Sequence, residues 1–166
     1  ILARSGFPET QAFAGCGAGD NQPNFGTADG LPAVIVAGLS AALSGISVWG
    51  HDVGGYLQNF EAAPKHIDLF MRWAQFGCFS PIMQMHRQVD GGNLRQYPWG
   101  YAQGGESIDN NSALDNYRFY AMLHTRLFPY LYTFAKQSSD NGSPITRPPG
   151  LSPQDEARTL TNPHTY

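Results

Sequence analysis

Short apolar segments alternate with longer helical patterns along most of the chain. Strand-like segments, rich in β-branched, aromatic or other apolar residues, are residues 1–3, 46–49 and 81–85. Apolar residues at helical spacing predict helices over residues 31–44, 67–79 and 114–136. This order of strands and helices favours an α/β fold, in which helical crossovers connect the strands of a parallel sheet.

Proline and glycine indicate where these helices begin, bend and end. Pro32 suits the first turn of a helix, and Gly45 is typical of the position after a helix ends. Pro129 lies inside the third helical pattern and has no N–H to donate, so we expect a kink there. A turn is expected at residues 138–142, with no regular element in the tail from Ser143.

Long polar loops follow the predicted strands. Residues 5–24 form such a loop, interrupted only by a short apolar piece around residues 13–16. Long loops after short strands are where a (β/α)₈ barrel carries its chemistry, and a complete barrel takes at least about 200 residues. With 166 residues, the chain has room for about half of one. An open doubly wound sheet is the alternative, but no Gly-x-Gly-x-x-Gly turn follows a strand.

Four polar side chains come at or near successive strand ends. They are Arg4, Asp20, Asp52 and His86. In a barrel, such residues converge on one pocket, because the carboxyl ends of parallel strands meet at one face. Each also has a purely structural interpretation: an ion pair for the arginine, turn formation for the two aspartates, and a buried, hydrogen-bonded side chain for the histidine.

Aromatic side chains near the same strand ends suggest a surface on which a sugar ring stacks. Trp49, Tyr56 and Trp99 have this position, although aromatic residues more often belong to a core. Other sites fit less well. His51, Asp52 and His86 lack the spacing of a metal site, no Gly-x-Ser-x-Gly elbow is present, and neither is a phosphate-binding Gly-rich loop.

Composition narrows the partners. The formal net charge is −3, which argues against nucleic acid or an anionic membrane as a partner. No apolar run approaches the ~18 residues of a membrane span. Only 14% of residues are charged, against about 25% in an ordinary domain, so part of the surface is expected to be covered, with a second copy of the chain one possible partner. Cys16 and Cys78 are expected to be two buried thiols.

The beginning of the chain carries no pattern that assigns a compartment. It starts with an apolar residue rather than Met, within a predicted strand, and shows no signal-peptide pattern. We therefore expect a piece of a longer protein, whose compartment stays open.

Six motifs occur in one consistent order along the chain. They are Arg4-Ser5-Gly6-Phe7-Pro8, Gly19-Asp20-Asn21, Gly50-His51-Asp52-Val53-Gly54-Gly55-Tyr56, Arg72-Trp73-Ala74-Gln75-Phe76-Gly77 with Ser80-Pro81 and His86, Arg126-Leu127-Phe128-Pro129-Tyr130-Leu131-Tyr132, and Pro144-Ile145-Thr146-Arg147-Pro148. This series resembles glycoside hydrolase family 31, which includes α-glucosidases, α-xylosidases and sulfoquinovosidases. The resemblance implies that residues 1–148 are the C-terminal half of the catalytic (β/α)₈ barrel, about strands five to eight. Residues 149–166 would lead into a following β-sandwich domain.

The resemblance also implies roles for single residues. Asp20 matches the general acid/base, and Arg4 and His86 match residues that hold the sugar beside it. Asp52 matches an acidic residue that lines or supports the same pocket. Tyr56 stands where many members have Phe and sulfoquinovosidases have Tyr. The nucleophile motif Trp-x-Asp-Met-Asn-Glu is absent from this chain.

The expected function is thus that of an exo-acting retaining α-glycosidase, of which this chain supplies the acid/base but not the nucleophile. No metal or organic cofactor is required. The expected partners are an α-linked glycoside or oligosaccharide, the rest of the barrel and the β-sandwich domains. Alternatives are a non-catalytic sugar-binding or degenerate member, and sulfoquinovosidase, transglycosylase or lyase specificity on the same fold.

Overall fold

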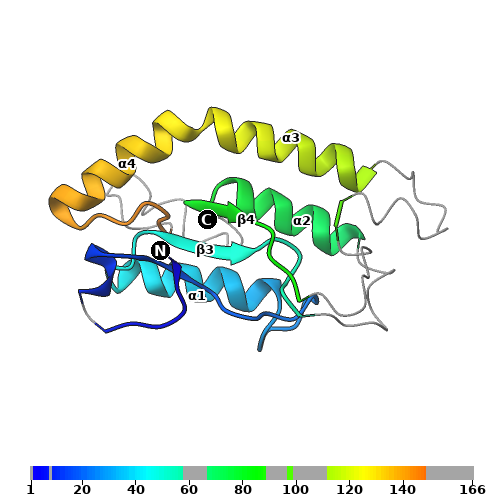
Figure 1. The fold of residues 1–166 in the computed structure, drawn as a ribbon, viewed down its shortest axis with the longest axis horizontal. Coiled ribbons are helices and arrows are strands. Elements are labelled where there is room, and N and C mark those ends of the chain that lie inside the picture. Colours follow the sequence, from blue (N-terminus) through cyan, green and yellow to red (C-terminus); the bar gives the residue numbers. More distant parts are fainter. Residues whose placement is uncertain (1, 8, 58–66, 89–96, 99–111, 149–166) are drawn as a thin grey trace, which may run out of the picture.

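A four-stranded parallel sheet forms the centre of the described chain (Figure 1). The computed structural model describes residues 2–7, 9–57, 67–88, 97–98 and 112–148. The strands lie in the order in which they occur along the chain, as β1 (Leu2–Ala3), β2 (Gly15–Gly17), β3 (Trp49–Asp52) and β4 (Ile82–Gln84).

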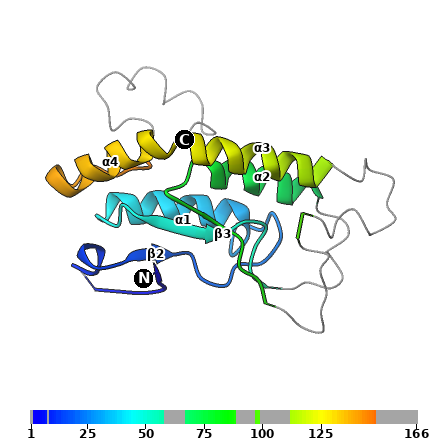
Figure 2. The same ribbon diagram turned by 45° about the horizontal axis from the view of Figure 1, so that its top comes forward.

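Helices connect and cover these strands. They are α1 (Leu31–Leu43), α2 (Ile67–Cys78), α3 (Ser112–Arg126), α4 (Phe128–Asn141) and the short 3₁₀ helix η1 (Thr10–Ala12). Helix α3 runs along α2 in Figure 1 and in Figure 2. Helix α4 continues from the end of α3.

The winding of the sheet is that of a barrel segment. Helix α1 connects β2 to β3, and α2 connects β3 to β4, so each crossover joins neighbouring parallel strands. Crossovers between parallel strands are right-handed. When each new strand is added at the same edge of the sheet, all crossover helices therefore lie on one face, as in a barrel. A doubly wound sheet reverses its strand order, and the described sheet does not. The α/β fold predicted from the sequence is confirmed; the numbering of the strands within the barrel stays a prediction. The linker at residues 149–166 lies outside the described residues.

The core lies between the sheet and α2. Phe70 and Trp73 of α2 are fully buried, as is Val53 just after β3. Each such side chain stabilises the fold by about 1.5–3 kcal/mol through removal of apolar surface from water. Cys16 and Cys78 are buried and unbonded, as expected. Helices α1 and α2 contribute to this core and contact β3 and β4, respectively.

Two strands differ from the sequence prediction. β2 was predicted only as an apolar piece within a loop, because two of its three residues are glycine, which strands disfavour. It nevertheless pairs with both β1 and β3. β3 begins at Trp49 rather than at residue 46, because Ile46 N–H donates to Ala41 O at the end of α1, and sheet pairing starts only at Val48 O. Asp52 is therefore the last residue of β3.

The third helical pattern is interrupted as predicted, but it also extends further. Pro129 lies in the first turn of α4, and the helix boundary falls at Leu127, between α3 and α4. The proline supplies no N–H for the carbonyl four residues earlier, which accounts for the break. The turn predicted at residues 138–142 is wrong, because α4 continues to Asn141. Gly142, at φ 75°, ends the helix in the left-handed conformation.

We expect residues 1–166 to associate when expressed alone. β1 and β4 are the outer strands of the described sheet, and an unpaired strand edge recruits other strands. Large apolar side chains on α3 and α4, such as Phe119 and Phe128, are also more than half exposed. Sedimentation velocity should show oligomers or aggregates, whereas a monodisperse monomer that unfolds cooperatively would contradict this expectation.

Candidate active site

A cavity of about 490 Å³ lies at the carboxyl ends of the four strands. Five of the seven residues predicted from the sequence to form a site line it: Arg4, Asp20, Asp52, Tyr56 and His86. Of the other two, Trp99 lies outside the described residues. The five lining residues come from four separate loops or strand ends, so the parallel sheet is what brings them together. The cavity therefore combines carboxylate, guanidinium, phenol and imidazole groups in one place.

Arg4 and Asp20, which both line this cavity, form an ion pair. Arg4 follows β1 directly, and Asp20 lies three residues after β2. The carboxylate is about one third exposed and the arginine side chain is 64% exposed, so both groups remain within reach of a bound molecule. Gly19, at φ 87°, turns the chain just before Asp20.

Asp52 is a nearly buried carboxyl group on the cavity wall. It is 7% exposed, and its Oδ1 accepts a hydrogen bond of 2.8 Å from Gln84 Nε2. Burial raises the pKa of Asp52, while the Gln84 hydrogen bond and the neighbouring His86 and Arg87 oppose that rise. The carboxyl group is thus held in a fixed orientation by the adjacent strand β4.

The ring of Tyr56 contacts both His86 and Arg4 at the cavity. Its ring meets the His86 ring edge-on, with centroids 5.1 Å apart. The Arg4 guanidinium carbon lies 5.9 Å from the centre of the same ring. A cation–π contact such as that of Arg4 with Tyr56 contributes about 0.5–1 kcal/mol at an exposed site. Tyr56 therefore forms one wall of the cavity between Arg4 and His86.

Backbone hydrogen bonds join three of the loops that carry these residues. The carbonyl oxygen of Asn21 accepts from Tyr56 N at 2.9 Å and from Leu57 N at 3.1 Å. The carbonyl oxygen of Tyr56 accepts from Gln88 N at 3.0 Å. The loops after β2, β3 and β4 are consequently linked next to Asp20, Tyr56 and His86.

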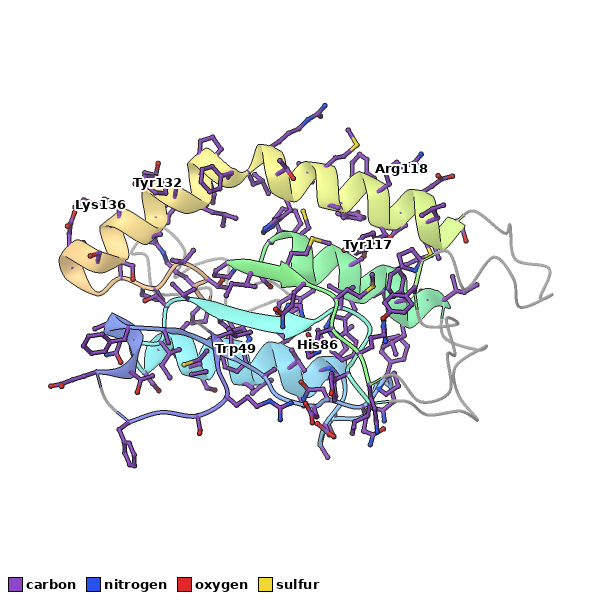
Figure 3. All side chains as sticks on the ribbon, in the orientation of Figure 1. Trp49, His86, Tyr117, Arg118, Tyr132 and Lys136 are labelled. Atoms are coloured by element: carbon purple, nitrogen blue, oxygen red, sulfur yellow. The ribbon has the colours of Figure 1, made fainter. Side chains whose placement is uncertain are left out.

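Trp49 is not part of this cavity. It is the first residue of β3, and a Cβ placed at Gly38 of α1 would lie 2.9 Å from its Nε1 atom. Figure 3 shows Trp49 near α1 and His86 beyond the end of β4. The structure thus packs this indole against α1 instead of bringing it to the other predicted residues.

His51 lies behind the cavity as the centre of a buried network. Trp73 Nε1 donates to His51 Nδ1 at 3.0 Å, so the ring carries its proton on Nε2, which lies 2.9 Å from Ser80 Oγ. Ser80 Oγ donates to the Phe76 carbonyl at 3.1 Å. Burial lowers the pKa of His51 to about 3, which keeps the ring neutral. The buried, hydrogen-bonded role considered for His86 from the sequence thus belongs to His51, whereas His86 is exposed.

Gln84 and Arg87 were missed by the sequence analysis. Gln84 is the last residue of β4 and lines the cavity. Arg87 is buried beside it and donates hydrogen bonds to backbone carbonyls after β3. The position of Gln84 at a strand end was the available signal, but nothing in the sequence distinguishes Arg87 from an exposed loop arginine.

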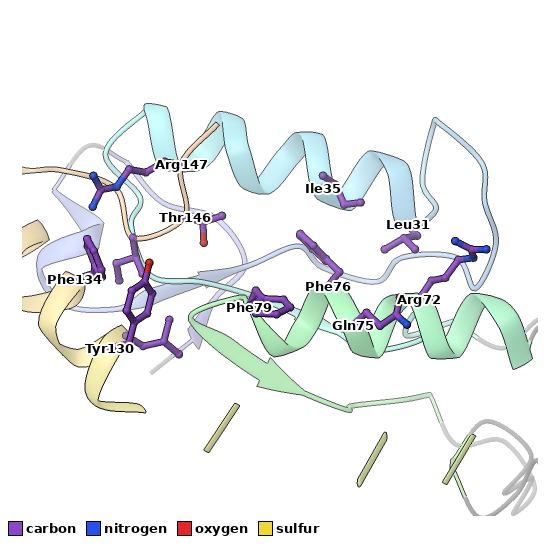
Figure 4. A pocket seen from close by; sticks show the side chains of 12 residues that line it. Leu31, Ile35, Arg72, Gln75, Phe76, Phe79, Tyr130, Phe134, Thr146 and Arg147 are labelled. Atoms are coloured by element: carbon purple, nitrogen blue, oxygen red, sulfur yellow. The ribbon is translucent and has the colours of Figure 1, made fainter. Parts of the chain in front are cut away.

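A second cavity, of about 660 Å³, lies between α1, α2, α4 and residues 145–147 (Figure 4). Apolar side chains such as Ile35, Phe76 and Tyr130 line it, together with Arg72 and Arg147. Its lining contains no carboxylate and no imidazole, the side chains that most often carry out acid/base chemistry. The cavity at the strand ends is therefore the candidate active site.

Neither a metal cluster nor a membrane-spanning helix occurs in the part of the chain that the structure describes. No three His, Cys, Asp or Glu side chains gather there as a cation site. No helix among the same residues is both long and apolar enough to cross a bilayer.

The parallel sheet is that of a segment of an α/β barrel. Its polar cavity lies at the carboxyl ends of the strands, where such barrels have their active sites. The sequence model described as "Glycosyl hydrolases family 31 TIM-barrel domain" matches residues 1–134. The chain therefore belongs to glycoside hydrolase family 31.

Individual relatives agree with this assignment. The chain is 30% identical to an isomaltosyltransferase from Sporosarcina globispora over 93% of its own length, and 31% identical to a sulfoquinovosidase from Escherichia coli (strain K12) over 90%. The structure of the cycloalternan-degrading enzyme from Trueperella pyogenes matches 89% of the chain with a TM-score of 0.74 and 30% identity. The chain spans only 14%, 20% and 20%, respectively, of these three proteins.

The buried His51 should make stability depend on pH. Between its usual pKa of 6.5 and the folded value of about 3, the unfolded state takes up a proton that the folded state does not. The folded state should therefore lose about 1.4 kcal/mol per pH unit as pH falls below ~6. In the protein that carries this chain, the thermal midpoint should fall more steeply from pH 7 to pH 5 than in the His51→Gln variant. Parallel pH profiles of the two proteins would contradict the buried neutral ring.

Proposed function

We propose that the protein carrying this chain is a retaining α-glycosidase that removes a terminal sugar, with Asp20 as its general acid/base. The observation that carries this proposal is the Arg4–Asp20 ion pair in a cavity that also holds Asp52 and His86. Membership of family 31 supports the reaction class. Relatives with names such as neutral alpha-glucosidase AB and alpha-xylosidase act on α-linked sugars, as their names state.

Asp20 would exchange one proton with the substrate in each half of the reaction. In the first half, the protonated carboxyl group gives its proton to the oxygen of the departing group, and the glycosidic bond breaks. In the second half, the carboxylate takes a proton from a water molecule that attacks the glycosyl-enzyme. Arg4 pairs with the ionised carboxylate, which is the form needed in this second half.

The nucleophile of this mechanism is a second carboxylate. Retaining enzymes place it about 5–5.5 Å from the acid/base, on the other side of the anomeric carbon. Asp52 is the second carboxyl group in the lining of the cavity, and it is largely buried and hydrogen-bonded to Gln84. This environment suits sugar binding better than nucleophilic attack. We therefore assign the nucleophile to a part of the protein outside this chain.

The remaining polar groups suit the hydroxyl groups of one sugar ring. The carboxylate of Asp52 accepts hydrogen bonds, while Arg4 donates them and His86 offers either function. Tyr56 adds an aromatic ring to the wall. Trp49 is not included in this set, because it lies against α1.

Sulfoquinovosidase or glycosyl transfer specificity is the second candidate within the same chemistry. Tyr56 and the 31% identity to the Escherichia coli sulfoquinovosidase favour the former, and the 30% identity to the isomaltosyltransferase favours the latter. Both use the same acid/base, so the choice between them depends on the acceptor and on groups outside this cavity.

The outer strands β1 and β4 provide the edges to which the rest of a barrel would pair. A closed barrel leaves no free edge, so the rest of the protein's own barrel is the partner that these strands require. A linker at residues 149–166 and β-sandwich domains that follow it belong to the same proposal.

Replacing Asp20 tests the proposed acid/base. In the protein that carries this chain, Asp20→Asn should lower kcat on an α-glucoside with a poor leaving group by roughly 10²–10⁴-fold. The loss should be smaller on a nitrophenyl α-glucoside, whose leaving group needs little protonation. Asp68→Asn, at an exposed ion pair on α2, is the matched control and should leave both rates unchanged. Near-normal turnover of the poor substrate by Asp20→Asn would refute the assignment.

A further inference from the structure

Arg87 is a buried cation that donates three hydrogen bonds to one loop. The residue is 5% exposed and follows His86 directly. Its Nη2 donates to the carbonyl of Val53 at 2.7 Å, and its Nη1 donates to those of Gly55 at 2.9 Å and Gly54 at 3.3 Å. Three consecutive carbonyl groups after β3 thus converge on one guanidinium.

The loop needs such a partner because of its backbone shape. Gly54 and Gly55 have φ values of 84° and 85°, which direct successive carbonyl groups toward the same side. Val53, Gly54 and Gly55 are all buried, and a buried carbonyl without a donor costs as much as a lost hydrogen bond. A planar guanidinium supplies several donors in a fixed fork, which a lysine ammonium cannot reproduce.

The same loop delivers Tyr56 to the cavity. Tyr56 is the residue immediately after Gly55, and its ring contacts both His86 and the Arg4 guanidinium. Arg87 and His86 are neighbours in the chain, so a single segment after β4 supplies one side chain to the cavity and one to the loop that forms its wall. The orientation of Tyr56 relative to His86 therefore depends on the Arg87 contacts.

We infer that Arg87 is a positioning residue for the sugar site: its buried guanidinium holds residues 53–55 so that Tyr56 stands between Arg4 and His86. The inference rests on the proposed function. Arg87 does not itself line the cavity, and it would determine the shape of the cavity through Tyr56.

A double-mutant cycle separates positioning from general stability. The variants are Arg87→Lys, Tyr56→Ala and the pair, made in the protein that carries this chain. The probes are p-nitrophenyl α-D-glucopyranoside for kcat and KM, and 1-deoxynojirimycin for binding of a glucose-shaped cation. Arg87→Lys should lower kcat/KM by about 10–100-fold, because a displacement of about 1 Å in a site has effects of this size.

The decisive result is the coupling between the two positions. Once Tyr56 is removed, Arg87→Lys should lower kcat/KM and iminosugar affinity by no more than about threefold, because no ring remains to be placed. Arg72→Lys, at an exposed pair on α2, is the matched control and should change neither quantity. A neutral variant, Arg87→Gln, should behave like Arg87→Lys if the directed fork rather than the charge is what matters.

Two outcomes would overturn the inference. One is full additivity of the two substitutions, which would show that Arg87 acts independently of Tyr56. The other is failure of both Arg87 variants to fold, which would assign Arg87 to the fold alone. A wild-type protein that binds the iminosugar but hydrolyses no glycoside would contradict the proposed function instead, while the binding cycle would still decide the role of Arg87.

Discussion

Hydrogen bonds among the loops at the carboxyl ends of β2, β3 and β4 are the constraint on which the site depends. The strands themselves have only two to four residues, so they fix where each loop starts but not where its polar side chains arrive. The carbonyl of Asn21 binds two N–H groups of the loop after β3, and the carbonyl of Tyr56 binds the segment after β4. Asp20 and Tyr56 are thereby placed by direct links between their own segments.

Two buried side chains, Arg87 and His51, hold the segments that these hydrogen bonds link, each in a different way. Arg87 is a charged group whose two Nη atoms donate to backbone carbonyls after β3, so it acts on that loop. His51 is a neutral group satisfied by Trp73 and Ser80, and it anchors β3 to α2 and to the turn before β4. A buried polar group is tolerated when its donors and acceptors are all used, and such a group then specifies one arrangement of its neighbours. Asp52 follows His51 directly, so the network also determines where that carboxyl group stands.

Much of the fold and most of the site could be predicted from the sequence, for physical reasons that differ between residues. The amphipathic spacing of α2 is a local pattern, and Pro32 and Gly45 indicated the ends of the almost uniformly apolar α1. Pro129 indicated the break between α3 and α4 through its missing N–H. β2 escaped prediction because its two glycines carry no strand preference, and its existence depends on neighbours on both sides. The position of Trp49 could not be predicted either, because the space left by Gly38 on α1 is a tertiary feature.

The most direct test of the central claim is a crystal structure of the complete protein trapped with 5-fluoro-α-D-glucosyl fluoride, which slows the second half of a retaining reaction. One sugar ring should occupy the cavity at the strand ends. Asp52 and His86 should be within hydrogen-bonding distance of its hydroxyl groups, and Asp20 should lie beside the face open to water. A sugar bound elsewhere, or bound in this cavity with its anomeric carbon turned away from Asp20, would contradict that claim.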